Sequence, residues 1–492
     1  MSSAAERAPV FQNEGKSSFE KFLGRYGIAA AFLFFALIYS APTAPGLTVQ
    51  GKIAAAVFFS ALILWVSESI PTYATALLVV VMLAVTGAWD EKSILGVFGY
   101  DVIWLMVSAF MITSAMEKTG VAKRLALFLV SRFGETAKRA LLGMIFANFI
   151  LAFIIPSTTA RAIVLFPIAI PLLQAYGAIP GKSNFGRLLM IQELQANNIF
   201  TAGVLTATAP QIMAVGYLRD LGGIQVSWLQ WLAASMPIAF LTMLFSYLIG
   251  FVLFPPEVQA PRGEGIEEMR KELASMGRLT SDEWKAIGLF VLTVFLWASG
   301  PYHTRMFGLN ISLVMTAIIS ATLAYLTGLL SWKETKIPWD LMIFSCGAYA
   351  AGTALEKSGA ASWALDRIFA KVNPAAISFP VIFAIVIFLS SFSHMVFTSK
   401  TVRTVILIPT IIGLAKATGY NPAALALPAA FTIADSITLP PNCKPNLIFY
   451  SAGQFTVLNQ FLYGVVVLAA KCLLLLVASF TLFRWLGISI RI

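Results

Sequence analysis

Two short stretches of the chain combine hydroxyl groups and positive charges in the same order. The first is Ser157-Thr-Thr-Ala-Arg161 and the second is Ser399-Lys-Thr-Val-Arg403, and each is followed at the same distance by a proline, Pro167 or Pro409. Hydroxyls can donate hydrogen bonds, and Lys and Arg add donors with a positive charge. Each stretch could therefore hold a carboxylate, so the pair predicts a site for a small anion with two carboxylates.

Two proline-containing breaks lie downstream of these stretches. Thr206-Ala-Thr-Ala-Pro210 and Leu439-Pro-Pro-Asn-Cys-Lys-Pro445 interrupt long apolar segments, and prolines in such segments free backbone groups for binding. His394, close to the second stretch, is a candidate pH-sensing group. The substrate-binding candidates that follow from hydroxyls, charges and breaks are Ser157, Thr158, Thr159, Arg161, Pro210, Ser399, Lys400, Thr401, Arg403, Lys444 and Pro445.

The composition indicates that these residues lie in a membrane protein. Of the 492 residues 59% are hydrophobic and 12% are charged, against about 25% charged in a typical globular domain. Because about 20 apolar residues cross a bilayer as a helix, the long apolar runs predict an all-α polytopic membrane protein. The net charge of +11 forms no basic stripe with interleaved aromatics, so no nucleic-acid partner is expected. The three cysteines are too far apart in sequence to indicate a disulfide or a zinc site.

Eleven transmembrane helices and two re-entrant hairpins are predicted. The apolar runs 140–176 and 376–415 are too long for one helix and have polar residues at their centres. Each predicts a hairpin, because polar tips at membrane depth are tolerated only where they line a cavity inside the protein. The predicted transmembrane helices span 28–47, 53–69, 74–90, 101–117, 187–216, 228–254, 284–300, 309–328, 338–356, 420–450 and 458–488.

The two halves of the chain repeat each other. Glu117-Lys-Thr-Gly120 and Glu356-Lys-Ser-Gly359 precede the two hairpins, and the paired stretches and breaks follow at similar spacing. Five helices in each half give the halves opposite topology, which is the inverted repeat of a secondary transporter. The predicted parts are a tail (1–27), a first helix with repeat 1 (28–255), a linker helix (256–283) and repeat 2 (284–492).

Basic residues set the expected orientation in the membrane. The tail and the segment 118–139 carry clusters of Lys and Arg, and the segment 256–283 is charged throughout. Because cytoplasmic loops are enriched in Lys and Arg, these three segments are expected in the cytoplasm. The parity of the spans then places the C-terminus outside.

The charged candidates also have structural alternatives. Arg161 and Arg403 could extend along the hairpins to lipid headgroups. Lys400 could serve only as a structural counter-ion, paired with Asp435 or Glu193.

Four other ionisable residues also have structural interpretations. His394 could be a satisfied buried polar residue, and Lys471, midway along the last predicted helix, could be paired or extend to the surface. Glu117 and Glu356 are expected to be helix-end residues, and neither is assigned a substrate role.

With two S-x-T triplets at predicted hairpin tips and a proline break in each following helix, the chain resembles the divalent anion:sodium symporter family, which includes INDY-type and citrate carriers. The resemblance extends from the second predicted helix to the end. The family usually carries Ser-Asn-Thr in both places, where it binds substrate carboxylates and helps to form two sodium sites. The resemblance implies a homodimer in the inner or plasma membrane, in which a transport domain moves against a scaffold domain as an elevator. It adds Thr208 and Cys443, at the position of the family's T-x-P threonine, to the substrate-binding candidates.

The chain departs from that pattern at both asparagines, where it has Thr158 and Lys400. An asparagine carbonyl can bind sodium, whereas lysine offers only donors and a fixed positive charge. Lys400 is therefore expected to repel sodium and to neutralise the substrate in its place. An empty carrier would have to move this uncompensated charge through protein of low dielectric constant, which costs several kcal/mol. Only the loaded carrier is expected to cross easily.

The sequence thus predicts a transporter that exchanges C4–C5 dicarboxylates such as 2-oxoglutarate, malate, fumarate or succinate, with no cofactor and without sodium. Two alternatives within transport are a sodium-coupled symporter whose sodium sites use backbone carbonyls, and a citrate/succinate antiporter. An anion channel would not need paired hairpins. An enzyme is not supported, because the sequence contains no HExxH, GxSxG or GxxxxGK[ST] motif.

Overall fold

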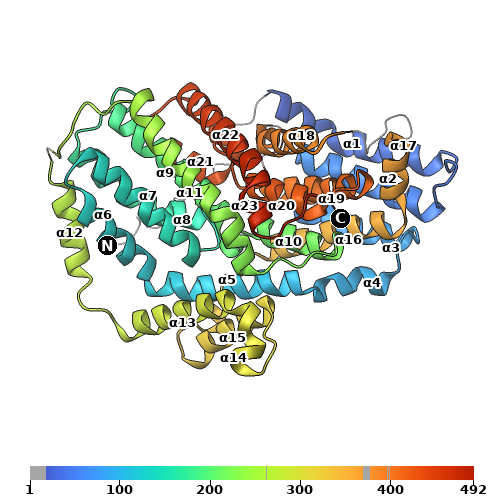
Figure 1. Cartoon of the computed structure of the whole chain (residues 1–492), viewed down its shortest axis with the longest axis horizontal. Helices are drawn as coiled ribbons and strands as arrows, with labels where there is room; N and C mark the ends of the chain where they lie inside the picture. The colour runs from blue at the N-terminus through green and yellow to red at the C-terminus, as the bar shows by residue number, and fades with distance from the viewer. Residues whose placement is uncertain (1–17, 262, 370–376, 396, 398, 492) are drawn as a thin grey trace. The chain divides into compact units, whose positions relative to one another are not determined.

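The computed structural model describes residues 18–261, 263–369, 377–395, 397 and 399–491. Within these residues the chain is helical without β-strands, which confirms the prediction of an all-helical fold (Figure 1). Most of the predicted tail, and residues 376, 396 and 398 of the second predicted hairpin, lie outside the described residues. The chain forms two compact units: residues up to Val97 with Ile343–Trp363, and Phe98–Met342 with the residues from Ala364 onward.

The first unit contains none of the candidate binding residues. Thr48 begins α2 by accepting a hydrogen bond from the Gly51 backbone N–H at 2.9 Å, and it donates to the Ser358 carbonyl at 2.9 Å. Gly347 lets α16 approach α3 closely, because a Cβ at this position would lie 2.5 Å from the Cβ of Ala76. The helices of this unit are α1 (Ser18–Ser40), α2 (Val49–Ser67), α3 (Thr72–Val85), α4 (Glu91–Gly96), most of α16 (Trp339–Lys357) and the start of α17 (Ala360–Phe369).

The second unit carries all the candidate residues, on two sets of helices. Each set includes a long helix that begins with a capping box, at Ser227–Gln230 for α11 and at Thr456–Asn459 for α22. The first set is α5 (Asp101–Thr119), α6 (Val121–Phe133), α7 (Ala137–Ile154), α8 (Thr158–Ala175), α9 (Asn184–Gly203), α10 (Ala209–Asp220) and α11 (Trp228–Leu253). The second set is α18 (Phe379–Phe392), α19 (Lys400–Ala417), α20 (Pro422–Ile433), α21 (Lys444–Tyr450), α22 (Val457–Phe480) and α23 (Leu482–Trp485).

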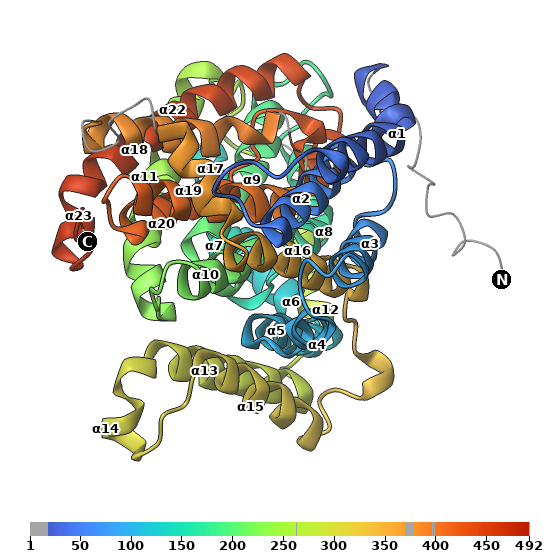
Figure 2. The same ribbon diagram turned by 90° about the vertical axis from the view of Figure 1, so that its right-hand side faces the viewer.

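Between these two sets the chain forms a linker helix and a helical pair. The linker helix is α12 (Gly265–Ser275), and it is followed by α13 (Ser281–Ala298), α14 (His303–Phe307) and α15 (Leu313–Leu326). α13 and α15 pack side by side, and α15 packs on α5 (Figure 2).

Several helices are long and apolar enough to cross a membrane. Among the described residues six helices meet this condition by length and composition, or seven if α13 and α14, which bend by 64°, form one span. α9 is not one of the six, and its sequence carries Gln192, Glu193, Gln195, Asn197 and Asn198. Both α7 and α8 meet the condition separately. The count of eleven helices and the re-entrant form of the hairpins therefore stay predictions.

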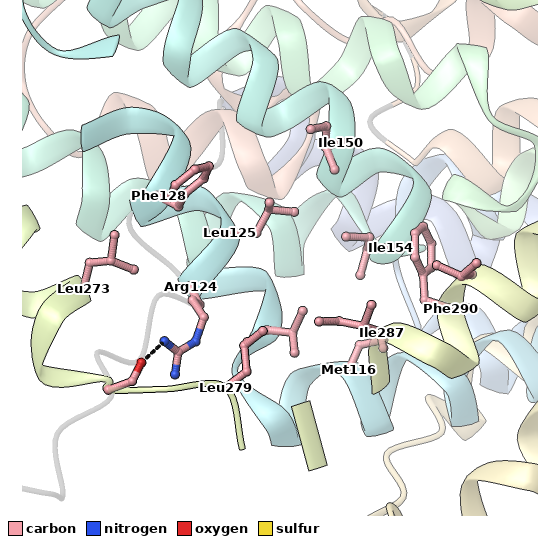
Figure 3. A pocket seen from close by; sticks show the side chains of 13 residues that line it. Met116, Arg124, Leu125, Phe128, Ile150, Ile154, Leu273, Leu279, Ile287 and Phe290 are labelled. Carbon is pink, nitrogen blue, oxygen red and sulfur yellow. Dashed lines mark hydrogen bonds between the residues drawn. The ribbon is translucent and has the colours of Figure 1, made fainter. Parts of the chain in front are cut away.

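The segment 118–139 is not a loop, because most of it forms α6. Arg124 of α6 forms an ion pair with Glu283 at 2.5 Å and donates to the carbonyls of Met276 and Gly277, each at 2.8 Å. Lys123 pairs with Glu272 at 2.7 Å. These contacts hold the linker against α6, beside an apolar pocket of about 580 Å³ whose lining includes Arg124 (Figure 3).

Candidate functional site

The two hydroxyl-rich stretches lie at the beginnings of α8 and α19. Ser157 Oγ accepts a hydrogen bond from the Ala160 backbone N–H at 3.3 Å, and Ser399 Oγ accepts from the Val402 N–H at 3.3 Å. Each serine is thus the N-cap of its helix, where the first N–H groups have no partner inside the helix. Both stretches therefore present free N–H groups and the positive end of a helix dipole, which favour an anion.

One turn of α9 contacts both of these helix beginnings. The Asn197 side-chain amide donates to the carbonyl of Thr158 at 2.8 Å. The next residue, Asn198, accepts a hydrogen bond from the Lys400 ammonium at 2.6 Å. All four residues are buried. α9 therefore brings together the two stretches that the sequence predicts as one site.

The two arginines make matching contacts in the two halves. Arg161 donates to the Thr201 hydroxyl and to the Asn197 carbonyl, the latter at 3.2 Å. Arg403 donates to the Ser436 hydroxyl at 3.1 Å and to the Ile433 carbonyl at 2.9 Å. Both side chains are fully buried. The alternative in which they extend to lipid headgroups is wrong, because buried guanidinium groups cannot reach the lipid.

The helix breaks are held by a second set of matching contacts. The Gln211 amide, one residue after Pro210, donates to the Thr201 carbonyl at 2.7 Å. The amide of Asn446, one residue after Pro445, donates to the Ser436 carbonyl at 2.6 Å. Thr201 and Ser436 are the same residues that bind the two arginines. Thr201 in the first half and Ser436 in the second half therefore each connect the arginine of a predicted hairpin to the helix that follows the break proline.

The two arginines differ in how many of their donors are used. Arg403 also donates to the Ser393 hydroxyl at 2.8 Å and to the Ser390 carbonyl at 2.9 Å. In contrast, Nε and Nη1 of Arg161 have no hydrogen-bond partner among the described residues, and neither does the side-chain oxygen of Asn197. Buried polar atoms are rarely left unpaired. Arg161 therefore retains donors that an anionic ligand can occupy.

Lys400 has no carboxylate partner among the described residues. Both pairings proposed as alternatives are wrong: Asp435 forms an ion pair with Lys471, and Glu193 accepts a hydrogen bond from an asparagine of α7 at 3.2 Å. The pairing of Lys471 is the alternative predicted for that residue. Lys400, which donates a hydrogen bond to the uncharged side chain of Asn198, is thus a buried cation without a counter-charge bound to it among the described residues.

His394 is enclosed near the second break. One ring nitrogen contacts the Ser391 carbonyl at 2.6 Å and the other contacts the Thr438 hydroxyl at 2.7 Å. The ring is fully buried. The structure thus satisfies both nitrogens, as the structural alternative predicts, and a pH-sensing role stays a prediction.

The remaining candidates differ in exposure. Thr208, Pro210 and Pro445 are buried at the two breaks, and Lys444 is exposed at the first residue of α21. The residues that are partly exposed are Thr159, Thr401 and Cys443. Cys443 lies 3.7 Å from the Asn198 oxygen that binds Lys400, measured from its sulfur.

Sequence reasoning missed the polar residues that join the two halves. Asn197, Asn198, Gln211 and Asn446 were not candidates. Asn197 and Asn198 bind Thr158 and Lys400, and Gln211 and Asn446 bind the residues that also accept from the two arginines. Two signals were available: an Asn-Asn pair inside a predicted transmembrane helix, and an amide residue directly after each break proline. A polar side chain at membrane depth is costly unless it has a partner.

Comparison with known proteins assigns the chain to a family. The family model described as "Sodium:sulfate symporter transmembrane region" matches residues 25–489. A sodium-dependent dicarboxylate transporter of Staphylococcus saprophyticus is 25% identical over 447 residues, covering 87% of this chain and 85% of that protein. An L-tartrate/succinate antiporter of Shigella boydii is 26% identical over 466 residues, covering 89% and 93%. A chloroplastic dicarboxylate transporter of Spinacia oleracea is 28% identical over 431 residues, covering 86% and 73%.

Solved structures share the fold at low sequence identity. The Neisseria gonorrhoeae MtrF structure superposes with a TM-score of 0.59 at 12% identity, covering 94% of this chain and 98% of that chain. The Alcanivorax borkumensis YdaH transporter gives a TM-score of 0.56 at 13% identity, covering 94% and 97%. The fold is therefore that of a helical membrane transporter. Together with the family match over nearly its whole length, this shows that the chain is a transporter rather than an enzyme and belongs to the sodium:sulfate symporter family, the divalent anion:sodium symporters.

Proposed function

We propose that the chain exchanges C4–C5 dicarboxylates, such as 2-oxoglutarate, malate, fumarate and succinate, across the membrane without sodium. The observation that carries this proposal is the placement of Lys400, whose buried ammonium donates to Asn198 at 2.6 Å, beside the beginnings of both α8 and α19. Relatives named as dicarboxylate transporters support the substrate class, and one named as an antiporter supports exchange.

The site offers one set of anion-binding groups from each half. The first half supplies Ser157, the free N–H groups of α8 and the unpaired donors of Arg161. The second half supplies Ser399 and the ammonium of Lys400. A dicarboxylate placed between them receives charge-assisted hydrogen bonds at both ends.

Exchange follows from the fixed charge. A bound sodium ion can dissociate before an empty carrier returns, whereas Lys400 cannot leave. Without substrate its charge is buried beside neutral groups, and moving it through protein of low dielectric constant costs several kcal/mol. The loaded site is compensated by the substrate carboxylates, so loaded carriers cross more easily than empty ones.

The membrane arrangement completes the proposal. We assign eleven transmembrane helices and two re-entrant hairpins in two inverted five-helix repeats, the N-terminus in the cytoplasm and the C-terminus outside. The repeat is supported by the matching Arg161–Thr201–Gln211 and Arg403–Ser436–Asn446 contacts. A homodimer whose transport domain moves as an elevator against its scaffold domain is carried over from the family resemblance.

A sodium-coupled symporter is the second candidate. The Staphylococcus saprophyticus relative, named as a sodium-dependent dicarboxylate transporter, favours it. In that case sodium would bind to backbone carbonyls at the two breaks, such as those near Thr208 and Cys443, because neither half keeps the family's Ser-Asn-Thr.

Uptake into proteoliposomes separates these candidates. Labelled succinate uptake would be measured into liposomes that are empty or loaded with succinate, each in sodium and in choline buffer. An exchanger requires internal succinate and is indifferent to sodium. Sodium-driven uptake into empty liposomes would contradict the proposal and favour the symporter. The absence of any dicarboxylate uptake would contradict both.

A further inference from the structure

A polar pocket lies directly outside the Ser157 helix cap. Its volume is about 290 Å³, and the first turn of α8 contributes Ser157 and Ala160 to its wall. The opposite walls come from the last turns of α5, with Ser114 and Glu117, and from the segment 336–338. At ~30 Å³ per water molecule this volume equals roughly ten waters, which is enough for a four-carbon dicarboxylate.

Lys336 and Glu117 both line this pocket and form an ion pair. The Lys336 ammonium lies 3.6 Å from the Glu117 carboxylate, and the two side chains are 80% and 32% exposed. Ser157, which lines the same pocket, is only partly exposed. An anion that arrives from water is therefore expected to meet the exposed Lys336 ammonium before the less exposed Ser157.

The backbone of the Lys336 segment is fixed although its side chain is exposed. The Lys336 N–H donates to the Ser114 hydroxyl at 2.9 Å. Just before it, Glu334 forms an ion pair with Lys118 at 2.9 Å and accepts a hydrogen bond from the Ser331 hydroxyl at 2.7 Å. The ammonium of Lys336 can thus change partner while its backbone stays in place.

We propose that Lys336 and Glu117 form an electrostatic gate at the entrance to the Ser157 site. An incoming dicarboxylate takes the Lys336 ammonium from Glu117 and is then passed to the helix cap at Ser157. Glu117 restores the ion pair afterwards and disfavours anions that cannot compete with its carboxylate. This assigns Glu117 a substrate-related role that its position at a helix end did not indicate. The proposal rests on the proposed function, because it requires an anionic substrate.

The gate acts on one face of the membrane only, whereas the binding site is used from both faces. In alternating access the same binding residues serve substrate from both faces, whereas an entrance residue serves only the face on which it lies. Lys336 and Glu117 lie beside the start of α6, whose Lys123, Arg124 and Arg132 place this end in the cytoplasm by the positive-inside rule. Lys336 should therefore affect the KM for substrate arriving from the cytoplasm only.

The test compares Lys336→Gln with Lys333→Gln. Lys333 is an exposed lysine of the same segment that does not line the pocket, so its loss removes the same charge without touching the gate. Succinate KM and maximal rate would be measured in whole cells and in succinate-loaded inside-out vesicles. An exposed ion pair is worth up to about 1 kcal/mol, so Lys336→Gln should raise the KM in inside-out vesicles about two- to fivefold at unchanged maximal rate. In whole cells the KM should stay at the wild-type value.

Two further variants sharpen the result. Glu117→Gln removes the carboxylate that competes for Lys336 and should lower the KM on the cytoplasmic face, while Lys336→Arg keeps the charge and should behave like the wild type. An equal KM change on both faces, an equal effect of Lys333→Gln, or no effect of Lys336→Gln would overturn the gate. Each of these outcomes leaves the proposed function intact as long as the wild type exchanges dicarboxylate, whereas an inactive wild type contradicts the proposed function itself.

Discussion

The candidate site contains three buried cations, and none of them has a carboxylate partner among the described residues. Arg161, Lys400 and Arg403 bind hydroxyls, amides and carbonyls, while the nearby carboxylate of Asp435 is paired with Lys471. A buried charge without a counter-charge is costly. A bound anion therefore stabilises the site, because it supplies the missing negative charge. Each of the three cations contributes to this stabilisation.

Lys400→Asn tests the contribution of the fixed charge. The change removes a charge-assisted hydrogen bond worth about 1.5–3 kcal/mol, so dicarboxylate affinity should fall roughly tenfold to a hundredfold. The empty carrier should cross more readily, because less uncompensated charge must be moved. The measurement is the ratio of succinate uptake into loaded and empty liposomes, which should fall towards one.

The matched control for this variant is Lys416→Asn, the same change in the last turn of α19. It should leave both affinity and ratio as in the wild type. If Lys400→Asn lowers affinity but keeps the ratio, Lys400 is only a ligand and another cation enforces exchange. If it changes neither, Lys400 does not contact the substrate.

The hydroxyls of Ser157 and Ser399 are predicted to bind the two ends of the substrate. Each of Ser157→Ala and Ser399→Ala should weaken dicarboxylate binding by about 1.5–3 kcal/mol, the value of a hydrogen bond to a charged group. Binding would be measured by titration calorimetry in detergent. Because each serine is also an N-cap, loss of helix stability must be separated from loss of binding.

Ser312→Ala separates these two effects. Ser312 caps α15 by accepting from the Met315 N–H at 3.1 Å, and it lies outside the candidate site. Its removal should cost a similar amount of thermal stability without changing affinity. If both Ser157→Ala and Ser399→Ala bind dicarboxylate with unchanged affinity, these two helix caps are not the substrate site.

At the scale of elements, the sequence predicts where the two helices are interrupted better than it predicts which residues bind at these interruptions. Pro210 and Pro445 mark the breaks because proline removes a backbone donor and cannot continue a helix. The partners of those breaks, Thr201 and Ser436, come from preceding segments of the chain, and the arginines that bind them come from other helices. Such contacts between distant segments depend on packing and cannot be read from local sequence.

α6 was missed for a different physical reason. Its residues Val121–Phe133 alternate apolar and charged side chains with helical period, and its Lys and Arg residues made the segment resemble a cytoplasmic loop. A short amphipathic helix of this kind is stabilised by the surfaces on either side of it. Arg124 and Lys123 bind the linker on one of these sides, which no pattern within α6 indicates.

The segment that carries Lys336 offers a prediction about pH. The Lys118 ammonium, together with hydrogen bonds from Ser331, lowers the pKa of Glu334 to about 2. A carboxyl whose pKa is lowered by folding stabilises the fold above its usual pKa of about 4.3, and this contribution is lost as the pH falls towards 2. The coupling between Lys118 and Glu334 should therefore be constant from pH 7 to 5 and should decrease at lower pH.

A double-mutant cycle measures that coupling. The melting temperatures of the wild type, Lys118→Gln, Glu334→Gln and the double variant would be recorded at pH 7, 5, 4 and 3. A coupling that grows as the pH falls would contradict the assignment, because protonation of Glu334 can only weaken its bond to the ammonium.

At the scale of the whole molecule, exchange sets the net charge that is moved in each cycle. A carrier that takes one succinate out for each succinate in moves no net charge. The equilibrium ratio of internal to external labelled succinate should therefore be independent of an imposed membrane potential. A carrier that moved one net charge per cycle would shift this ratio about fiftyfold at 100 mV, because one charge is worth about 2.3 kcal/mol at that potential. The measurement uses potassium-loaded liposomes with valinomycin.

Asn197 and Asn198 are neighbours in α9, yet each of them contacts a different half of the site. Consecutive residues of an α-helix point in directions about 100° apart and are displaced by about 1.5 Å along the axis. α9 can thus contact Thr158 and Lys400 at the same time only in one rotation about its own axis. A single residue inserted between the two asparagines would turn the rest of α9 by that angle. The bond to Thr158 could then be kept only if the bond to Lys400 were lost. The number of residues in this part of α9 is therefore fixed by the two bonds.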